Sequence, residues 1–231
     1  MFKKHNISGS SVLDHLGLVA ATIDKLGISK EIDKRLPLSY GGKTTHGQRV
    51  SAMILNGLGF MDDRLYLFPK FLANQPVAKL LGGKVTAADF NDASLGRCLD
   101  AIHAYGITKL FSEVSLSIAL KHKLLGRSVH LDTTTLSVYG AYENDQTPNN
   151  DVVQSVDSSA VSRENERLNL PINPIPTHGY AKNKRFDLKQ MTLLLATSGA
   201  ANFPVWMESH SGNASDQTTL EAAAKRMQIA P

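Results

Sequence analysis

The sequence predicts an α+β protein, in which an all-α N-terminal bundle is followed by an incomplete mixed sheet, a three-strand meander plus one helix. Three observations predict this class. Apolar residues recur at spacings of three and four over residues 11–123, as they do on one face of amphipathic helices. Extended runs rich in valine, threonine and leucine begin at residue 128. A helical pattern follows the last of these runs, and no further strand pattern succeeds it.

The N-terminal helices are delimited by ordinary start and stop signals. The first pattern ends before Gly27, a common helix stop, and Thr45 is placed to cap a helix that runs to Leu58. Short connections between such segments are typical of helix bundles. In order, we expect helical segments at residues 12–26, 29–36, 45–58, 68–72, 76–81, 92–104 and 107–123.

The first predicted strand, residues 128–140 (SVHLDTTTLSVYG), carries an unexpected carboxylate. Strands favour the β-branched residues found here and disfavour aspartate, yet Asp132 lies in the middle. Strand alternation places Asp132 on one face with His130 and Thr134, and Thr133 on the other. A carboxylate that projects from a sheet either pairs with a cation or holds a metal ion, and the residues alone leave both alternatives open.

A polar, proline-punctuated stretch separates this strand from two more, at residues 190–197 and 203–210. Ser215 or Asp216 is then placed to cap a final helix over residues 217–227. A meander followed by a crossover helix normally delivers a further strand, parallel to the first. We therefore expect two domains, a helical one over residues 1–126 and an incomplete sheet domain over residues 127–231, with a long polar loop at about 141–177.

Composition excludes several classes of protein. The formal net charge of +4 permits a polyanionic partner without requiring one. The single cysteine, Cys98, excludes an internal disulfide framework, and its apolar neighbours place it in a helix core. No uncharged apolar run is long enough to cross a membrane, and the N-terminus lacks the apolar block of a secretory signal. We expect a cytoplasmic protein.

Four motifs resemble transposases of the IS4-like group, in particular its IS1634-like branch. HLDTTTLSVYG, HGYAKNKRFDLKQ and GNASDQTTL are similar to segments of the catalytic part. FNDASLGRCLDAIHAYG resembles the helical region that precedes it, which is often described as a domain of unknown function. The motifs are collinear, and the resemblance extends from about residue 12 to about residue 227.

The resemblance implies that the sheet is the start of a ribonuclease-H-like core that cuts and joins DNA with two aspartates and a glutamate. Asp132 matches the first of these and would be the catalytic and metal-binding residue, with Mg²⁺ or Mn²⁺ as the cofactor. The later aspartate and glutamate have no counterpart in this chain. One carboxylate cannot assemble two metal ions roughly 4 Å apart. We therefore expect that the chain alone does not transpose DNA.

A basic cluster before the second strand is the candidate DNA-binding surface. Lysine and arginine supply most non-specific affinity for DNA, although a short basic run is equally typical of a solvated turn. We expect Asp187 to pair with Lys189 or to cap a turn, and Tyr180 and Trp206 to be packing residues rather than base-stacking platforms. The cluster comprises Lys182, Lys184, Arg185 and Lys189.

Several other residues have weaker claims to function. The helix at residues 45–58 has the length of a recognition helix, with Lys43 and Arg49 near its start, but core packing is the favoured interpretation. Asp216 is expected to be a helix cap. Glu208 lies on a meander strand and is not the late glutamate of the family.

Three hypotheses of function follow. The leading one is an N-terminal portion of an insertion-sequence transposase, with DNA at the transposon ends as its partner, no membrane, and a second copy of the chain as a further candidate partner. The second is a non-catalytic DNA-binding product that occupies transposon ends. The third is an inert remnant with an exposed, adhesive edge beside the first strand.

Overall fold

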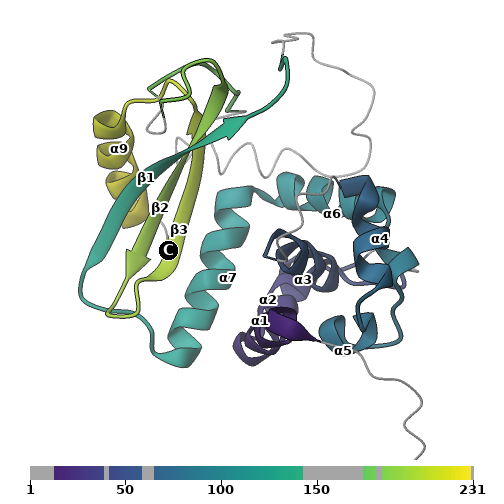
Figure 1. The fold of residues 1–231 in the computed structure, drawn as a ribbon. Helices are drawn as coiled ribbons and strands as arrows, with labels where there is room; N and C mark the ends of the chain where they lie inside the picture. The colour runs from purple at the N-terminus through teal and green to yellow at the C-terminus, as the bar shows by residue number, and fades with distance from the viewer. Residues whose placement is uncertain (1–12, 39–41, 59–64, 143–173, 181–183, 230–231) are drawn as a thin grey trace, which may run out of the picture. The chain divides into compact units, whose positions relative to one another are not determined.

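The computed structural model of the chain describes residues 13–38, 42–58, 65–142, 174–180 and 184–229 (Figure 1). It confirms the predicted α+β class, because a helical N-terminal region is followed by a three-stranded antiparallel sheet and a C-terminal helix. The chain forms two compact units, Met1–Ile102 and His103–Pro231, which are described separately. Every helix in the described part is too short or too polar to cross a bilayer.

The first unit consists of short helices around one apolar core. Phe68, Phe90, Leu55 and Leu72 are its largest buried side chains, each at most 1% exposed. Cys98 is fully buried, as predicted. The helical elements are α1 (Asp14–Leu26), α2 (Ile28–Arg35), α3 (His46–Gly57), η1 (Leu65–Leu67), α4 (Phe68–Ala73), α5 (Val77–Leu81), η2 (Ala87–Phe90) and the greater part of α6 (Asp92–Tyr105).

Helix α3 begins where the sequence predicts, because Thr45 caps it. The Thr45 hydroxyl accepts a hydrogen bond from the Gln48 backbone N–H at 3.1 Å, and the Gln48 side-chain oxygen accepts one from the Thr45 backbone N–H at 3.0 Å. This reciprocal capping box satisfies donors that the start of a helix leaves unpaired. The same end of α3 is held against α2, since the Gly47 N–H donates to Asp33 Oδ1 at 2.7 Å.

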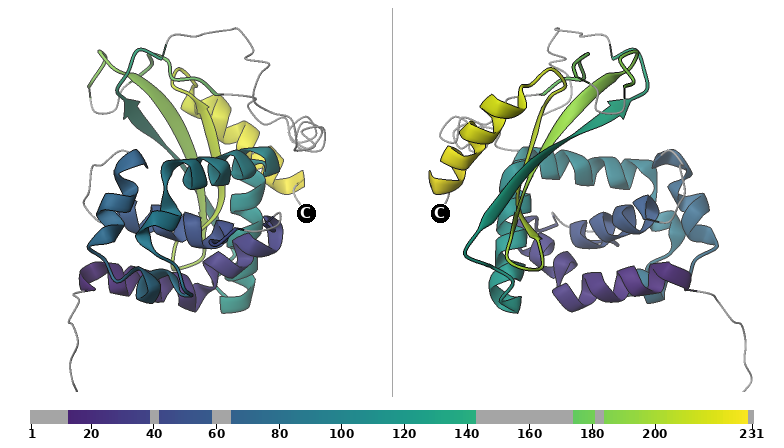
Figure 2. Two further views of the ribbon diagram at one scale, coloured as in Figure 1. Left: turned by 90° about the vertical axis from the view of Figure 1, so that its right-hand side faces the viewer. Right: turned by 60° about the vertical axis from the view of Figure 1, so that its left-hand side comes forward.

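The second unit is a three-stranded sheet with a helix on each face. Its elements are α7 (Ile107–His122), β1 (Val129–Val138), β2 (Lys189–Ser198), β3 (Phe203–Ser211) and α9 (Asp216–Ile229). Each strand lies within two residues of its predicted bounds. The strand order is β1-β2-β3, with both pairs antiparallel. Helix α9 covers one face of the sheet, and α7 lies along β3 on the other (Figures 1 and 2).

The register of the strands decides which side chains meet under α9. Thr133 on β1 pairs with Leu194 on β2, which pairs with Glu208 on β3, so all three share one face. Leu194 is fully buried there and packs in the cluster that includes Trp206 and Ala223. The face that packs against α9 is therefore the better-buried face of the sheet.

The compact units differ from the predicted domains in the position of one boundary. The helical domain was expected to extend to residue 126, but α7 lies in the second compact unit, where it packs against β3. Most of the predicted polar loop, residues 143–173, lies outside the described residues. Its end is anchored, since Thr177 forms an isolated antiparallel bridge with Gln190 at the start of β2.

Candidate functional site

Asp132 lies in the middle of β1 with its carboxylate exposed to solvent. Its Oδ1 accepts a hydrogen bond from the Thr133 backbone N–H at 2.8 Å. Within the described residues no lysine or arginine forms an ion pair with it, so the alternative of a buried salt-bridge partner does not hold there. The remaining carboxylate lone pairs face water and can accept a cation.

The neighbouring residue, Thr133, shows which way Asp132 points. The Thr133 hydroxyl donates to Asp216 Oδ1 on α9 at 2.7 Å, so its side chain faces α9. Because side chains alternate along a strand, Asp132 points away from α9, together with the exposed His130 and Thr134. Asp216, the first residue of α9, therefore ties the start of that helix to β1, a role that the sequence does not reveal.

Oxygen ligands of the Asp132 type suit Mg²⁺ or Mn²⁺, but such ions need more than one protein carboxylate or other donors to form a catalytic pair. No group of three histidine, cysteine, aspartate or glutamate side chains gathers in the described ranges in a way that could hold a metal. The type of donor therefore fits the implied ion, whereas the number of donors present does not.

The predicted DNA-binding cluster is only partly available for phosphate. Lys184 is exposed and Lys182 lies outside the described residues. Arg185 donates two hydrogen bonds to Asp187, at 2.8 and 2.7 Å, so Asp187 pairs with arginine and not with Lys189. Lys189 instead donates to the backbone carbonyls of residues 141 and 142, which follow the end of β1 in the chain.

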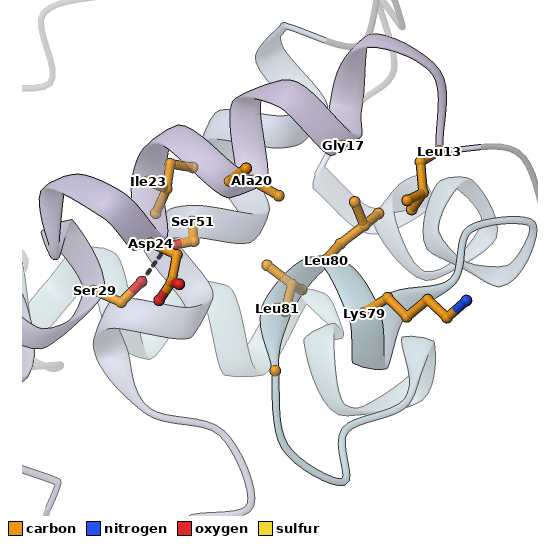
Figure 3. A pocket seen from close by; sticks show the side chains of 12 residues that line it. Leu13, Gly17, Ala20, Ile23, Asp24, Ser29, Ser51, Lys79, Leu80 and Leu81 are labelled. Atoms are coloured by element: carbon orange, nitrogen blue, oxygen red, sulfur yellow. Dashed lines mark hydrogen bonds between the residues drawn. The ribbon is translucent and has the colours of Figure 1, made fainter.

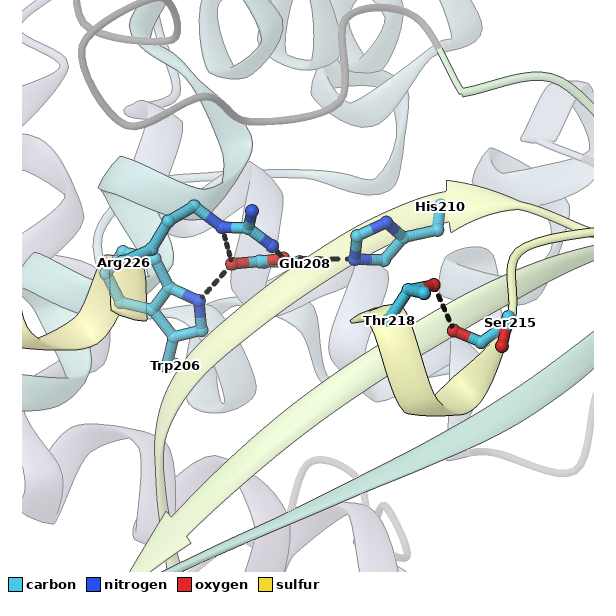
Figure 4. A network of polar contacts seen from close by, with 6 residues as sticks. All are labelled: Trp206, Glu208, His210, Ser215, Thr218 and Arg226. Carbon is cyan, nitrogen blue, oxygen red and sulfur yellow. Dashed lines mark hydrogen bonds and ion pairs between the residues drawn. The ribbon is translucent and has the colours of Figure 1, made fainter. Parts of the chain in front are cut away.

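A buried charge network, which sequence reasoning missed, joins α9 to β3 (Figure 4). Glu208 is 1% exposed and accepts hydrogen bonds from Trp206 Nε1 at 2.8 Å and from Arg226 Nε at 2.8 Å. A second Arg226 nitrogen bonds its other oxygen, which also lies 3.0 Å from His210 Nε2. The sequence did contain a signal for this network. Trp206, Glu208 and His210 are spaced two apart and so lie on one face of the strand, and an arginine follows in the next, alanine-rich helix.

The pKa of Glu208 records how well this network satisfies the carboxylate. Burial by itself would raise the pKa, but the hydrogen bonds from His210, Arg226 and Trp206, together with the charge of Arg226, outweigh it and lower the pKa to about 2. Glu208 is therefore ionised at every physiological pH. All its partners lie on β3 and α9, so the ionised carboxylate holds α9 against β3.

Acid should weaken the Glu208 network between α9 and β3 in a defined pH window. The folded pKa lies below the ordinary value of 4.5, so the stabilisation is complete above about pH 4.5 and is lost as the pH falls towards 2. The difference between the ordinary and the folded pKa of Glu208 corresponds to about 3 kcal/mol of folding free energy. We expect urea unfolding, followed by the fluorescence of the single tryptophan, to show this loss. In Glu208→Gln the acid-dependent part should be smaller by that amount; equal acid sensitivity in both proteins would contradict it.

Trp206 and Tyr180 were both predicted to be packing residues. Trp206 is 5% exposed, as a packing residue should be. Tyr180 is 79% exposed, and for this residue the prediction is wrong. Tyr180 follows a segment that pairs with β2, yet its side chain is exposed.

The favoured interpretation of α3 as a packing helix agrees with the structure. Arg49 is 7% exposed, and its Nε donates to the Thr44 hydroxyl at 3.0 Å. Lys43 is exposed, with Asp89 Oδ1 at 3.6 Å from its Nζ. A buried arginine cannot enter a DNA groove without rearrangement, so α3 does not present the features of a recognition helix.

A cavity of about 340 Å³ lies between α1, α3 and α5 in the first unit (Figure 3). Its walls combine apolar side chains, such as Ile23 and Leu80, with polar ones. Two of its polar groups satisfy each other, since the Ser29 and Ser51 hydroxyls are hydrogen-bonded at 2.7 Å. Lys79 points away from the cavity in Figure 3. Asp24 also lines the cavity, so its polar side chains are this carboxylate and the mutually bonded serines, with Lys79 directed outward.

Fold and site together define a protein with a helical domain and a sheet unit that exposes a mid-strand carboxylate. Residues 8–116 match the sequence profile of a domain of unknown function, DUF4277. The chain thus carries a DUF4277 domain over residues 8–116, which include most of its helical region. The match ends within α7 and does not include Asp132. No curated protein and no solved structure matches the chain.

Proposed function

We propose that the chain is the N-terminal portion of a DNA transposase of the IS4-like group. In this proposal the DUF4277 domain precedes the first strands of a ribonuclease-H-like core, and the complete enzyme cleaves DNA and transfers strands with Mg²⁺ or Mn²⁺. The observation that carries the proposal is Asp132, exposed and free of ion pairs within the described residues, midway along the first strand of an antiparallel meander.

The topology after Asp132 also supports the proposal. Helix α9 starts beside β1, at Thr133, and ends near Trp206 and Glu208 on β3. Thr133 and Glu208 lie in the same register row, so these contacts take α9 across the face of the sheet. Its place in the chain, after the third strand of the meander, is that of a crossover helix that precedes a strand parallel to the first. The outer edge of β1 carries no partner strand in the described part of the chain, so a parallel strand has room to pair there.

We expect this chain by itself to bind DNA without cutting it, because Asp132 is the only member of the implied trio that it supplies. Purified chain should leave a supercoiled plasmid intact in Mg²⁺ or Mn²⁺. Metal-dependent nicking that disappears in Asp132→Ala would show that the chain is catalytically competent, and would overturn this prediction.

The proposed role of Asp132 has a direct test by NMR. In the complex with duplex DNA, added Mn²⁺ should broaden the amide signals of Thr133 and its register neighbour Leu194 more strongly than those of distant strand residues. Asp132→Asn should abolish that selective broadening. Glu221→Gln is the matched control, since Glu221 is an exposed carboxylate of the same unit, paired with Lys225 on α9. Equal broadening in both variants would exclude Asp132 as a metal ligand.

A non-catalytic DNA-binding role is the second candidate, and the net charge of +4 with an exposed Lys184 favours it. The two candidates differ in what Asp132 does. If wild type binds DNA with no selective Mn²⁺ broadening at Thr133, and Asp132→Asn leaves the DNA affinity unchanged, binding without metal is the better description.

A further inference from the structure

Exposed aromatic side chains gather at the end of the sheet where β1 finishes and β2 begins. Tyr139 is 72% exposed, Tyr142 46%, Tyr180 79% and Phe186 59%. Among the described residues, the other comparably exposed aromatic side chain is Tyr66 in the first unit. Large rings are normally withdrawn from water, so a local concentration of exposed ones marks an interaction site.

Three segments that are distant in sequence bring these rings to the same end of the sheet. Val138 pairs with Lys189 in the β1–β2 register, so the residues that follow β1 lie next to those that precede β2. Lys189 Nζ donates to the carbonyl of Tyr142 at 2.5 Å. His178 Nδ1 lies 3.3 Å from the carbonyl oxygen of Phe186, which joins the third segment to the other two.

Among the described residues, an exposed lysine and an arginine–aspartate ion pair lie between the rings. Lys184 is exposed and adopts a left-handed backbone conformation with φ 61°, which turns the chain sharply ahead of β2. Arg185 is also exposed, and its pKa is raised by the hydrogen bond and charge of Asp187 and, to a smaller extent, by the hydroxyl of Tyr139. In the described part of this region the carboxylate is Asp187, and its charge is offset by Arg185.

We propose that this aromatic–basic surface, formed by Tyr139, Tyr142, Tyr180, Phe186 and Lys184, binds single-stranded DNA by stacking its bases on the rings and placing a phosphate at Lys184. The inference rests on the proposed function for its choice of DNA as the partner. It adds that the strand is unpaired at this surface, because the flat faces of bases are accessible to rings only outside a stacked duplex.

Rings and cations have separable effects on binding, which makes the proposal testable. Alanine substitution of a stacking ring typically weakens binding by about 5- to 150-fold per base, with little effect on the salt dependence. Loss of a phosphate contact instead reduces the slope of log affinity against log salt by about 0.7 for a single strand.

The experiment measures fluorescence anisotropy of a labelled oligothymidylate and of a labelled duplex, titrated with the full chain. Wild type should bind the single strand more tightly than the duplex. Tyr180→Ala and Phe186→Ala should each weaken single-strand binding by about 5- to 150-fold and leave duplex binding unchanged. Tyr180→Phe should restore wild-type affinity, and Lys184→Ala should lower the salt slope. Tyr66→Ala, an equally exposed ring elsewhere, is the matched control.

Each contrary outcome has a distinct meaning. If the ring variants bind the single strand as tightly as wild type does, or lose single-strand and duplex affinity equally, the surface does not stack bases, while the proposed DNA partner stands. If wild type binds neither DNA at low salt, both the surface and the proposed function are wrong. Unchanged circular dichroism of each variant establishes that the fold is intact.

Discussion

Replacing Arg226 with methionine should lower the free energy of unfolding of the sheet unit by about 3–5 kcal/mol. The substitution leaves Glu208, which is 1% exposed, as a buried carboxylate that has lost its guanidinium partner. The remaining hydrogen bonds from Trp206 and His210 cannot replace that charge. Urea unfolding of the full chain, followed by the fluorescence of Trp206, measures the loss at the site itself.

The matched control is Lys225→Met on the preceding residue of α9. Lys225 pairs with Glu221 in solvent, where such a pair contributes about 0–1 kcal/mol. The double variant Glu208→Leu with Arg226→Met should recover most of the loss, because removing both charges leaves neither one buried alone. If Arg226→Met lowered the free energy of unfolding as little as Lys225→Met does, the network would not stabilise the packing of α9 on β3.

Gly47→Ala should be the most damaging single change in the helical unit. An added Cβ at Gly47 would lie 2.1 Å from the Ser29 carbonyl oxygen and 2.7 Å from the Ser29 Cα, both of them backbone atoms. A side chain could rotate away from such a contact, but the backbone of α2 must move, which also strains the hydrogen bond from the Gly47 N–H to Asp33. We expect a loss of about 3 kcal/mol, the upper end of the usual cost of overpacking.

Gly57→Ala at the other end of α3 is the matched control. A Cβ there meets no atom within 4 Å, so the substitution should be neutral or should stabilise the helix by up to about 1 kcal/mol. Thermal unfolding of both variants in the full chain, followed by circular dichroism at the helix band, separates them. A similar midpoint for the two proteins would show that α2 and α3 do not approach as closely as described.

Several features of the second unit were predictable from local patterns. A β-branched run, a continuous apolar run and an alternating pattern located the three strands, and alternation placed Asp132 and Thr133 on opposite faces, as found. The Thr45 cap was predictable because capping depends on residues three apart in the chain. Such features follow from the period of a helix or strand, which is fixed by the backbone alone.

The candidate site was predicted less completely. The sequence contains one basic run, formed by Lys182, Lys184, Arg185 and Lys189. In the described structure, however, Arg185 is paired with Asp187, and Lys189 donates hydrogen bonds to backbone carbonyls. Tyr180 was predicted to pack, whereas its ring stands in solvent. Neither outcome follows from spacing, because each depends on which other segment lies within hydrogen-bond or van der Waals reach.

The sequence by itself determined the order and kind of the elements, the burial of Cys98 in the helical core, and the position of one carboxylate in the first strand. Tertiary structure alone decided that Arg226 meets Glu208, that Asp216 meets Thr133, and that aromatic rings from three segments share one end of the sheet. The physical reason is that a periodic pattern fixes the face on which a side chain lies, whereas its partner is set by the packing of segments distant in the chain.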